Sequence, residues 1–298
     1  MAEQNKVGYV DVPGGKVWYE VTGGGGGGGG GGLPLITLHG GPGSTHFGFE
    51  PLKALSEDRP VVFYDQLGCG NSDRPDDLSL WTVERFVEEL HILRIHLGLG
   101  RCHILGHSWG TMLGMDYYLA HPDGILSLVQ SSPCISIQRW VEDCNNYRNQ
   151  LPAEVQAVMA EHEKAGTTGS QEYKDAEKEF NKRHVLRMDP VPEAILQGRR
   201  ERGTVVYETM WGPNEFYMTG NLADYDRSGD LHKIGVPALY SCGRFDEAAP
   251  DTVNWYAELT PNSEFVVYEN SAHMPHWEET SRYISVVRNF LRKNDELA

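Results

Sequence analysis

The sequence predicts an α/β fold in which a mostly parallel central sheet is interrupted by a helical insertion. Short apolar runs alternate with helical patterns over residues 1–132, and the same alternation resumes over residues 234–298. Between them, residues 133–233 are charged and rich in helical patterns. Alternating strands and helices form right-handed crossovers and therefore parallel sheets. A chain of 298 residues is long enough for one large domain with an inserted subdomain.

Two segments near the N-terminus predict an antiparallel hairpin, and short apolar runs predict the remaining strands. The hairpin comprises residues 7–12 and 16–21, which are joined by Pro13-Gly14-Gly15. The further strands are expected at residues 35–38, 61–64, 102–105, 126–129, 236–240 and 264–268. Helices are expected around residues 48–57, 82–97, 109–120 and 278–291, with Thr82 as the N-cap of the second.

The insertion is expected to form a helical cap. Stretches within it, such as residues 171–184, are too polar for the core of a sheet. An insertion after the sixth strand can lie over the carboxyl ends of parallel strands, where open α/β sheets place their active sites. We therefore expect a core of residues 1–132 and 234–298 and a cap, or lid, of residues 133–233.

An unbroken run of glycine extends from Gly23 to Gly32. Because a glycine homopolymer forms neither a strand nor a helix of its own, residues 23–32 predict a flexible loop. The sequence leaves open whether the run is natural, engineered or a placeholder for other residues, and we assign it no function.

The composition argues against several classes of partner. The chain has 26 basic and 42 acidic side chains, a formal charge of −16, which disfavours nucleic acid and anionic membranes. No apolar stretch approaches the roughly 18 residues that span a bilayer, and residues 1–6 lack the features of a signal peptide. Five cysteines without paired spacing favour a reducing compartment, so a cytoplasmic location is expected. The oligomeric state stays open.

The motif Gly106-His107-Ser108-Trp109-Gly110 lies between an apolar strand and a helical pattern. A Gly-x-Ser-x-Gly in this context is the nucleophile elbow of the α/β-hydrolase fold. The serine must occupy a sharp, strained turn, and glycines on either side let the strand and the helix approach closely. Ser108 is therefore the predicted nucleophile.

The other members of a catalytic triad are predicted from chain order, which in this fold is Ser, then Asp, then His. Asp246 and His273 each lie a few residues beyond the end of a predicted strand. Asp246 would orient His273, which would take the proton from Ser108. His276 and Asp251 are weaker alternatives, since each adjoins a predicted helix, and the side chain of His107 is expected to point away from Ser108.

A glycine-rich turn, His39-Gly40-Gly41-Pro42-Gly43, follows the predicted strand at residues 35–38. Backbone N–H groups that point at one position stabilise the anionic oxygen of a tetrahedral intermediate. We expect the N–H groups of Gly41 and Trp109 to form this oxyanion hole. No metal or cofactor is expected, because no His/Cys/Asp cluster has the spacing of metal ligands.

Three motifs together resemble the proline iminopeptidases, which are serine aminopeptidases of the α/β-hydrolase superfamily. They are residues 39–43, residues 64–72 (YDQLGCGNS) and residues 106–110. The resemblance covers nearly the whole chain and departs visibly at Leu67, where many members have Arg. It includes relatives that act as L-amino acid amidases. It implies that Glu215, within Trp211-Gly212-Pro213-Asn214-Glu215-Phe216, binds the substrate amine together with Glu247.

The resulting expectation is a serine aminopeptidase that releases an N-terminal proline, or another small apolar residue, from short peptides or amides. Its expected partner is a small substrate with a free N-terminal amine. An amino-acid amidase, and a lactone or ester hydrolase with the same triad, remain alternatives. A catalytically silent binding protein on this fold is a further alternative. Epoxide hydrolase and dehalogenase chemistry is disfavoured, because those relatives need Asp where Ser108 stands.

Overall fold

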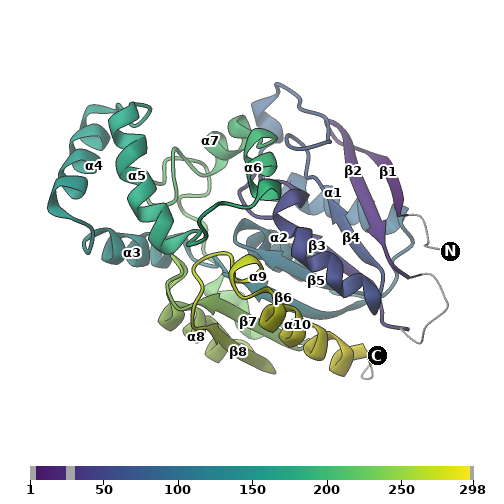
Figure 1. The fold of residues 1–298 in the computed structure, drawn as a ribbon. Helices are drawn as coiled ribbons and strands as arrows, with labels where there is room; N and C mark the ends of the chain where they lie inside the picture. The colour runs from purple at the N-terminus through teal and green to yellow at the C-terminus, as the bar shows by residue number, and fades with distance from the viewer. Residues whose placement is uncertain (1–4, 25–30, 296–298) are drawn as a thin grey trace.

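The computed structural model describes residues 5–24 and 31–295. An eight-stranded sheet with strand order β1-β2-β4-β3-β5-β6-β7-β8 forms its centre (Figure 1). The strands are β1 (Lys6–Val12), β2 (Gly15–Thr22), β3 (Leu35–Leu38), β4 (Val61–Tyr64), β5 (Cys102–His107), β6 (Ile125–Ser131), β7 (Ala238–Gly243) and β8 (Ser263–Tyr268). The expected loop of residues 23–32 lies, over residues 25–30, outside the described residues.

The ladder directions confirm a mostly parallel sheet. The pairs β1–β2 and β2–β4 are antiparallel, and all pairs from β4 onwards across the sheet are parallel. Each predicted strand is present, most within one or two residues of the expected bounds. The expected strand at residues 236–240 instead begins at Ala238, because Pro237 has no N–H to donate to a neighbouring strand.

Two layers of helices cover the sheet. One face packs against η1 (His46–Glu57) and α10 (Thr280–Asp295), with Leu52, Val287 and Leu291 in its core. The other face packs against α1 (Val83–His96), α2 (Trp109–Ala120) and α8 (Pro250–Leu259). The expected helix at residues 48–57 is a 3₁₀ helix that contains Pro51, which cannot donate the hydrogen bond that an α-helix interior needs.

Two helix ends test the sequence prediction further. Thr82 is the N-cap of α1, because its Oγ1 accepts the Arg85 N–H at 3.3 Å. The expected helix at residues 278–291 is α10, which begins at Thr280 and is preceded by the short helix α9 (Pro275–Glu278). The two helices are separated at Glu279, which leaves the helical conformation and whose Oε2 accepts the Asn270 N–H at 2.9 Å.

The insertion between β6 and β7 is helical and lies beside one end of the sheet (Figure 1). It contains α3 (Ile137–Arg148), α4 (Ala153–Ala165), α5 (Gln171–His184), α6 (Glu193–Arg200) and α7 (Thr204–Met210), and η3 (Ser228–Lys233) follows. The chain enters and leaves the insertion through antiparallel segments, since Ile137 donates to the Tyr225 carbonyl at 3.0 Å and Arg227 donates to the Ile135 carbonyl at 2.9 Å.

A buried carboxylate fastens the returning segment to α2. Asp116 accepts the Tyr225 hydroxyl at 2.6 Å, and it accepts the Arg227 guanidinium through Nε at 2.9 Å and Nη2 at 2.6 Å. Asp116 and Tyr225 lie on segments 109 residues apart in the chain. Charge-assisted hydrogen bonds of this kind are shorter and stronger than neutral ones. The contact therefore holds the base of the insertion against the sheet domain.

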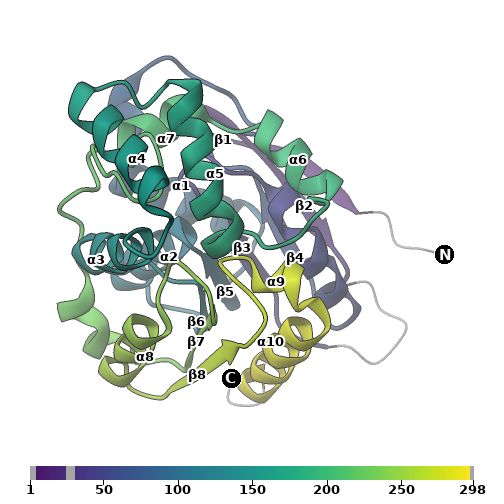
Figure 2. The ribbon, with the colours of Figure 1, turned by 60° about the vertical axis from the view of Figure 1, so that its left-hand side comes forward.

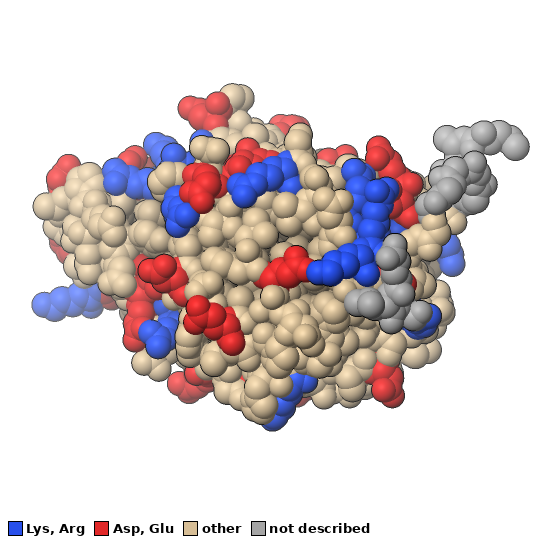
Figure 3. Space-filling model, turned by 90° about the horizontal axis from the view of Figure 1, so that it is seen from below, with Lys and Arg blue, Asp and Glu red and all other residues tan. Residues whose placement is uncertain are grey.

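None of the described helices is long and apolar enough to cross a membrane. Figure 3 shows that acidic and basic side chains are interspersed on the face it presents, without a continuous basic area.

We predict that Asp116→Ala destabilises the protein, because it removes the carboxylate that accepts the Tyr225 hydroxyl and two N–H groups of Arg227. Hydrogen bonds to charged groups are worth about 1.5–3 kcal/mol, so we expect the free energy of unfolding in urea to fall by about that amount. Asp175→Ala is the control, because Asp175 is exposed on α5 and pairs with Lys178 at i,i+3 spacing. Equal losses in the two variants would contradict the prediction.

Candidate active site

Ser108 occupies a sharp turn between β5 and α2. Its backbone has φ 54° and ψ −124°, a left-handed conformation that costs free energy for a residue with a side chain. The turn is held on both sides. The Ser108 N–H donates to the Ser131 carbonyl at 3.1 Å, and the Thr111 hydroxyl donates to the Ser108 carbonyl at 2.6 Å.

The two glycines of the motif are required by close backbone contacts. A Cβ at Gly110 would collide with the carbonyl oxygen of Leu38 at the end of β3, and a Cβ at Gly106 would collide with the carbonyl oxygen of Gly110. Leu38 and Gly106 are register partners in the parallel β3–β5 ladder. Strand, turn and helix therefore pack at backbone contact, as the motif predicted.

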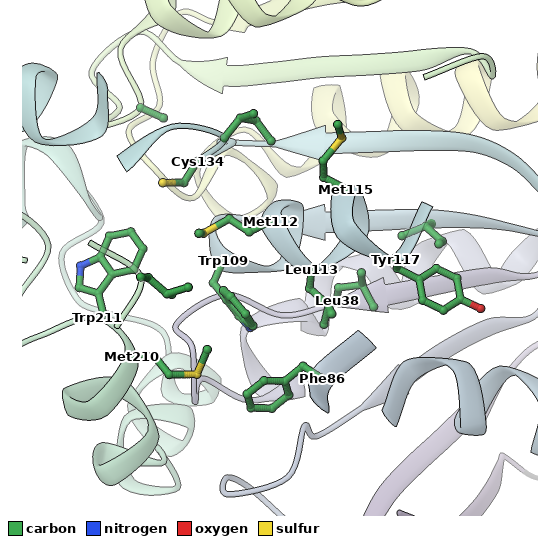
Figure 4. Packing of buried hydrophobic residues seen from close by; sticks show 14 of the residues in the cluster. Leu38, Phe86, Trp109, Met112, Leu113, Met115, Tyr117, Cys134, Met210 and Trp211 are labelled. Carbon is green, nitrogen blue, oxygen red and sulfur yellow. The ribbon is translucent and has the colours of Figure 1, made fainter. Parts of the chain in front are cut away.

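The side chain of Trp109 anchors the start of α2 in the core. Its ring packs edge-to-face against Phe86 at a centroid distance of 5.6 Å, as Figure 4 shows. The indole N–H donates to Gln66 Oε1 at 2.8 Å, which satisfies its buried polar atom. The Trp109 ring is thus directed into the core.

Asp246 and His273 meet as predicted. His273 Nδ1 lies 2.7 Å from Asp246 Oδ1, and both side chains are buried. The carboxylate is held in place by two backbone donors, the Ala248 N–H at 2.9 Å and the Gly243 N–H at 3.3 Å. This contact leaves His273 Nε2 as the free nitrogen of the ring.

The backbone of His273 is fastened to the strands that carry Ser108. His107 Nε2 donates to the His273 carbonyl at 2.8 Å, and the Ser132 hydroxyl donates to the same oxygen at 3.0 Å. The hydrogen bonds of the described residues do not include one between the Ser108 hydroxyl and His273. Instead, His273 Nε2 faces Glu247 Oε1 at 3.8 Å.

The glycine-rich turn after β3 lies against Ser108. A Cβ placed on Gly40 would stand 3.1 Å from the Cβ of Ser108. Gly41 has φ 112°, a conformation that favours glycine. Neither the Gly41 N–H nor the Trp109 N–H donates to a protein acceptor within the described part of the chain. The Gly41 amide belongs to the turn that packs on Ser108, and the Trp109 amide belongs to the residue that follows it.

Glu215 lies in the segment between α7 and η3, and two residues fix it. The Tyr207 hydroxyl donates to its Oε1 at 2.8 Å, and the Trp140 indole donates to its backbone carbonyl at 2.8 Å. The Trp140 ring also packs edge-to-face on His273 at 5.5 Å and on Trp211 at 5.6 Å. Glu215 is thus tied to the same aromatic side chain that flanks His273.

Glu247 is a fully buried carboxylate whose two oxygens have no hydrogen-bond partner in the described structure. Burial raises the pKa of the Glu247 carboxyl well above its usual range, and the charges of Glu215 and Asp246 raise it further. An unpaired carboxylate in this position is costly, so the site is electrostatically incomplete without a cation.

His184, the last residue of α5, holds two backbone amides of the site, and no sequence motif indicated this role. Its carbonyl accepts the Glu247 N–H at 3.3 Å and the His273 N–H at 3.2 Å. Its ring Nδ1 donates to the Phe245 carbonyl at 2.9 Å. In Figure 2 the C-terminal end of α5 points at the loop that leads to α9. Tyr207 was missed as well, and no motif marks either residue: His184 contacts segments far away in the chain, and Tyr207 reaches Glu215 eight residues later through a turn that the sequence did not define.

The weaker alternatives for the triad are placed elsewhere. His276 Nε2 donates to the Gly48 carbonyl at 3.1 Å, and burial lowers the pKa of His276 to about 3. Asp251 is exposed in the first turn of α8.

Three residues of types that bind metals lie close together near the glycine-rich turn. Their spacing in the sequence did not predict this cluster. Ligand-type atoms of His39, Asp65 and Cys69 lie within 4.8 Å of one another. Each is already in a hydrogen bond: His39 Nε2 accepts the Gln66 N–H at 3.0 Å, Cys69 Sγ donates to the Gln66 carbonyl at 3.1 Å, and Asp65 Oδ1 accepts the His46 N–H at 2.8 Å. Burial raises the pKa of the Cys69 thiol well above its usual range. We interpret the group as a buried hydrogen-bond network that stabilises this turn.

Comparison with known proteins agrees with this geometry. The family model of the alpha/beta hydrolase fold matches residues 34–280. A proline iminopeptidase of Heyndrickxia coagulans is 47% identical over 285 residues, which cover 95% of this chain and 98% of that protein. The crystal structure of a proline iminopeptidase from Mycobacterium smegmatis has a TM-score of 0.90 and 35% identity, and covers 98% of this chain and 99% of its own. The crystal structure of VinJ has a TM-score of 0.91 and 38% identity, with coverage of 97% and 99%.

The fold and the strand–serine–helix turn define an α/β hydrolase. Within that class, the chain belongs to the proline iminopeptidase family. The resemblance inferred from the three motifs is confirmed.

We predict that Glu247→Gln stabilises the protein, and that the gain grows with pH. In the unfolded chain Glu247 loses its proton near pH 4.3, whereas the folded protein retains it to a higher pH. Wild type therefore loses stability as pH rises from about 4.3 towards the raised pKa, by at most about 1.4 kcal/mol per pH unit. The glutamine variant has no such loss.

The measurement is thermal unfolding of both proteins at pH 5, 6.5 and 8. Glu208→Gln, at an exposed position of α7, is the matched control. A difference in Tm between wild type and Glu247→Gln that stays constant over this range would contradict the assignment of a raised pKa.

Proposed function

We propose that this protein is a serine aminopeptidase that releases N-terminal proline, or another small apolar residue, from short peptides or amides. The observation that carries the proposal is the combination of a nucleophile turn with two carboxylates beside it. Membership in the proline iminopeptidase family supports the same activity. The triad alone fits any ester or amide hydrolysis, whereas the carboxylates add a requirement for a cationic substrate group.

In this proposal Ser108 attacks the carbonyl carbon of the first residue. His273 Nε2 takes the hydroxyl proton and later gives it to the leaving amine, while Asp246 holds Nδ1–H and stabilises the imidazolium. The N–H groups of Gly41 and Trp109 receive the oxyanion of the tetrahedral intermediate. Water then hydrolyses the acyl-enzyme by the same proton transfers in reverse.

Glu215 and Glu247 bind the amine. An N-terminal proline carries a secondary ammonium with two N–H bonds, so each carboxylate can accept one of them. Binding the amine at this place fixes which carbonyl reaches Ser108, and so limits cleavage to the first residue. The edge-to-face aromatic rings of Trp140 and Trp211 add an apolar surface beside His273. The small, saturated ring of proline fits this surface.

The organisation of the chain follows the same proposal. We assign residues 1–132 and 234–298 to the hydrolase core and residues 133–233 to a cap that contributes Glu215. The antiparallel entry and exit segments near Ile137 and Tyr225 support this division. We also propose a cytoplasmic location, supported by cysteines that are all buried and free. Fractionation of the source cells tests the location.

The proposed activity is tested with a panel of p-nitroanilides. Prolyl, alanyl and leucyl anilides are each supplied with a free and an acetylated amine, alongside a lactone and a simple ester. We expect the free prolyl substrate to have the highest kcat/KM. Preference for the acetylated substrates or the lactone would overturn the aminopeptidase assignment in favour of a general esterase or lactonase.

We predict that Ser108→Ala abolishes turnover, leaving only the modest rate that the oxyanion hole and bound substrate supply without a nucleophile. Mass spectrometry of the wild type, after reaction with a serine-directed organophosphate, checks the site of attack. One label per chain on Ser108 is expected. A label elsewhere, with activity retained in the variant, would refute the assignment.

We predict that Glu215→Gln lowers kcat/KM for free-amine substrates by about ten- to a hundredfold, because one charge-assisted hydrogen bond is worth about 1.5–3 kcal/mol. Hydrolysis of an N-acetylated ester should change little, since that substrate presents no ammonium. Glu208→Gln is the control on the same cap. Equal losses on free and blocked substrates would show that Glu215 only supports the cap.

A further inference from the structure

Glu247 stands between the proposed amine site and the catalytic base. Its Oε1 lies 3.8 Å from His273 Nε2, the nitrogen that must accept the proton of Ser108. Neither oxygen of Glu247 has a hydrogen-bond partner, and the side chain is fully buried. A side-chain rotation that moves Oε1 by about 1 Å brings the carboxyl group to hydrogen-bond distance of Nε2.

The ionisable groups around Glu247 contain no lysine or arginine to balance its charge. Two carboxylates of its surroundings, Glu215 and Glu177, come from the cap, and a third, Asp246, precedes it in the chain. The remaining groups are the His273 ring, the Tyr207 hydroxyl and the thiols of Cys134 and Cys144. A buried carboxyl surrounded by carboxylates takes up a proton in preference to remaining ionised.

We propose that in the free protein Glu247 carries a proton and donates it to His273 Nε2, and that the substrate ammonium displaces this proton and so frees the base. The proposal rests on the proposed function, because it takes the amine to bind at Glu215 and Glu247. It adds that occupancy of the amine site controls whether His273 is available to Ser108.

In the free protein the O–H of Glu247 donates to the lone pair of His273 Nε2, so the Ser108 hydroxyl has no acceptor there. When the ammonium arrives, the O–H bond of Glu247 breaks and its proton leaves to the solvent. The carboxylate then pairs with the ammonium. The lone pair of Nε2 is free to accept the proton of Ser108.

The consequence is a selectivity that substrate affinity alone does not supply. An N-acetylated substrate has no charge to displace the proton, so His273 stays engaged with Glu247 even when the substrate is bound. Its low rate then appears in kcat as well as in KM. A free amine raises kcat and lowers KM, because the same contact that holds the substrate also releases the base.

The test is calorimetric titration with L-prolinol, which keeps the ring and ammonium of an N-terminal proline but has no carbonyl to be attacked. Titration in phosphate and in Tris, whose heats of ionisation differ, counts the protons released on binding. We expect about one proton per prolinol bound to wild type at neutral pH, and an affinity that rises by up to tenfold per pH unit while Glu247 is protonated in the free protein. Tetrahydrofurfuryl alcohol, the uncharged ring analogue, should release none.

Glu247→Gln and Glu208→Gln are titrated in the same way, after thermal unfolding has shown that both are folded. Glu247→Gln should bind prolinol at least tenfold more weakly and release no proton, whereas Glu208→Gln should match wild type. His273 is present in every variant, so any proton that it releases persists in Glu247→Gln. The proton count of wild type needs no variant and stands alone as a test.

The outcomes separate this inference from the proposed function. Prolinol that binds wild type without proton release, and binds Glu247→Gln more weakly, overturns the proton displacement but leaves the amine site intact. Equal affinity for wild type and Glu247→Gln overturns the amine site itself. Proton release that persists in Glu247→Gln also overturns the inference, because another group then supplies the proton.

Discussion

The backbone contact between α2 and the end of β3 is the constraint on which the rest of the site depends. A Cβ on Gly110 would collide with the Leu38 carbonyl oxygen, so only glycine allows this contact, which holds the helix that follows Ser108 against β3. The turn after β3 begins at that same carbonyl, and its Gly40 packs against Ser108. The proposed nucleophile and the turn proposed to supply an oxyanion donor are therefore positioned by main-chain geometry rather than by flexible side chains.

The charges of the site, unlike its backbone contacts, are only partly compensated by neighbouring groups. Asp246 is satisfied by His273 and by two amides, and its charge is compensated locally. Glu247, one residue later, has no hydrogen-bond partner among the described residues, and its Oε1 lies 3.8 Å from His273 Nε2. Adjacent residues of one loop thus differ in environment: the carboxylate of Asp246 is hydrogen-bonded on every side, and that of Glu247 is not. Such local cost is tolerated because the large apolar clusters on both faces of the sheet supply the stability.

The sequence predicted those features that depend on local chain geometry. Ser108, Asp246 and His273 each follow a strand, and parallel strands end at one edge, so their placement at one edge of the sheet followed from the pattern, and Asp246 and His273 are in contact there. The α/β class, the insertion and the N-cap at Thr82 followed for similar reasons. Contacts between distant segments were not predictable: the Trp140 indole reaches the Glu215 carbonyl 75 residues away in the chain, and the grouping of His39 with Cys69 depends on how two loops fold together. The 3₁₀ form of η1 was missed because the spacing of apolar residues alone does not distinguish a 3₁₀ helix from an α-helix.

Through the carbonyl of His184, α5 holds the loops that carry Glu247 and His273, in addition to covering the site. The last carbonyls of a helix have no N–H donor within the helix, and the amides of a loop need acceptors. Here one helix end and two loop amides satisfy each other. A chimera that replaced the helical insertion would therefore have to supply an acceptor at the same point for the amides of Glu247 and His273. The helical insertion and the sheet are thus joined through main-chain hydrogen bonds.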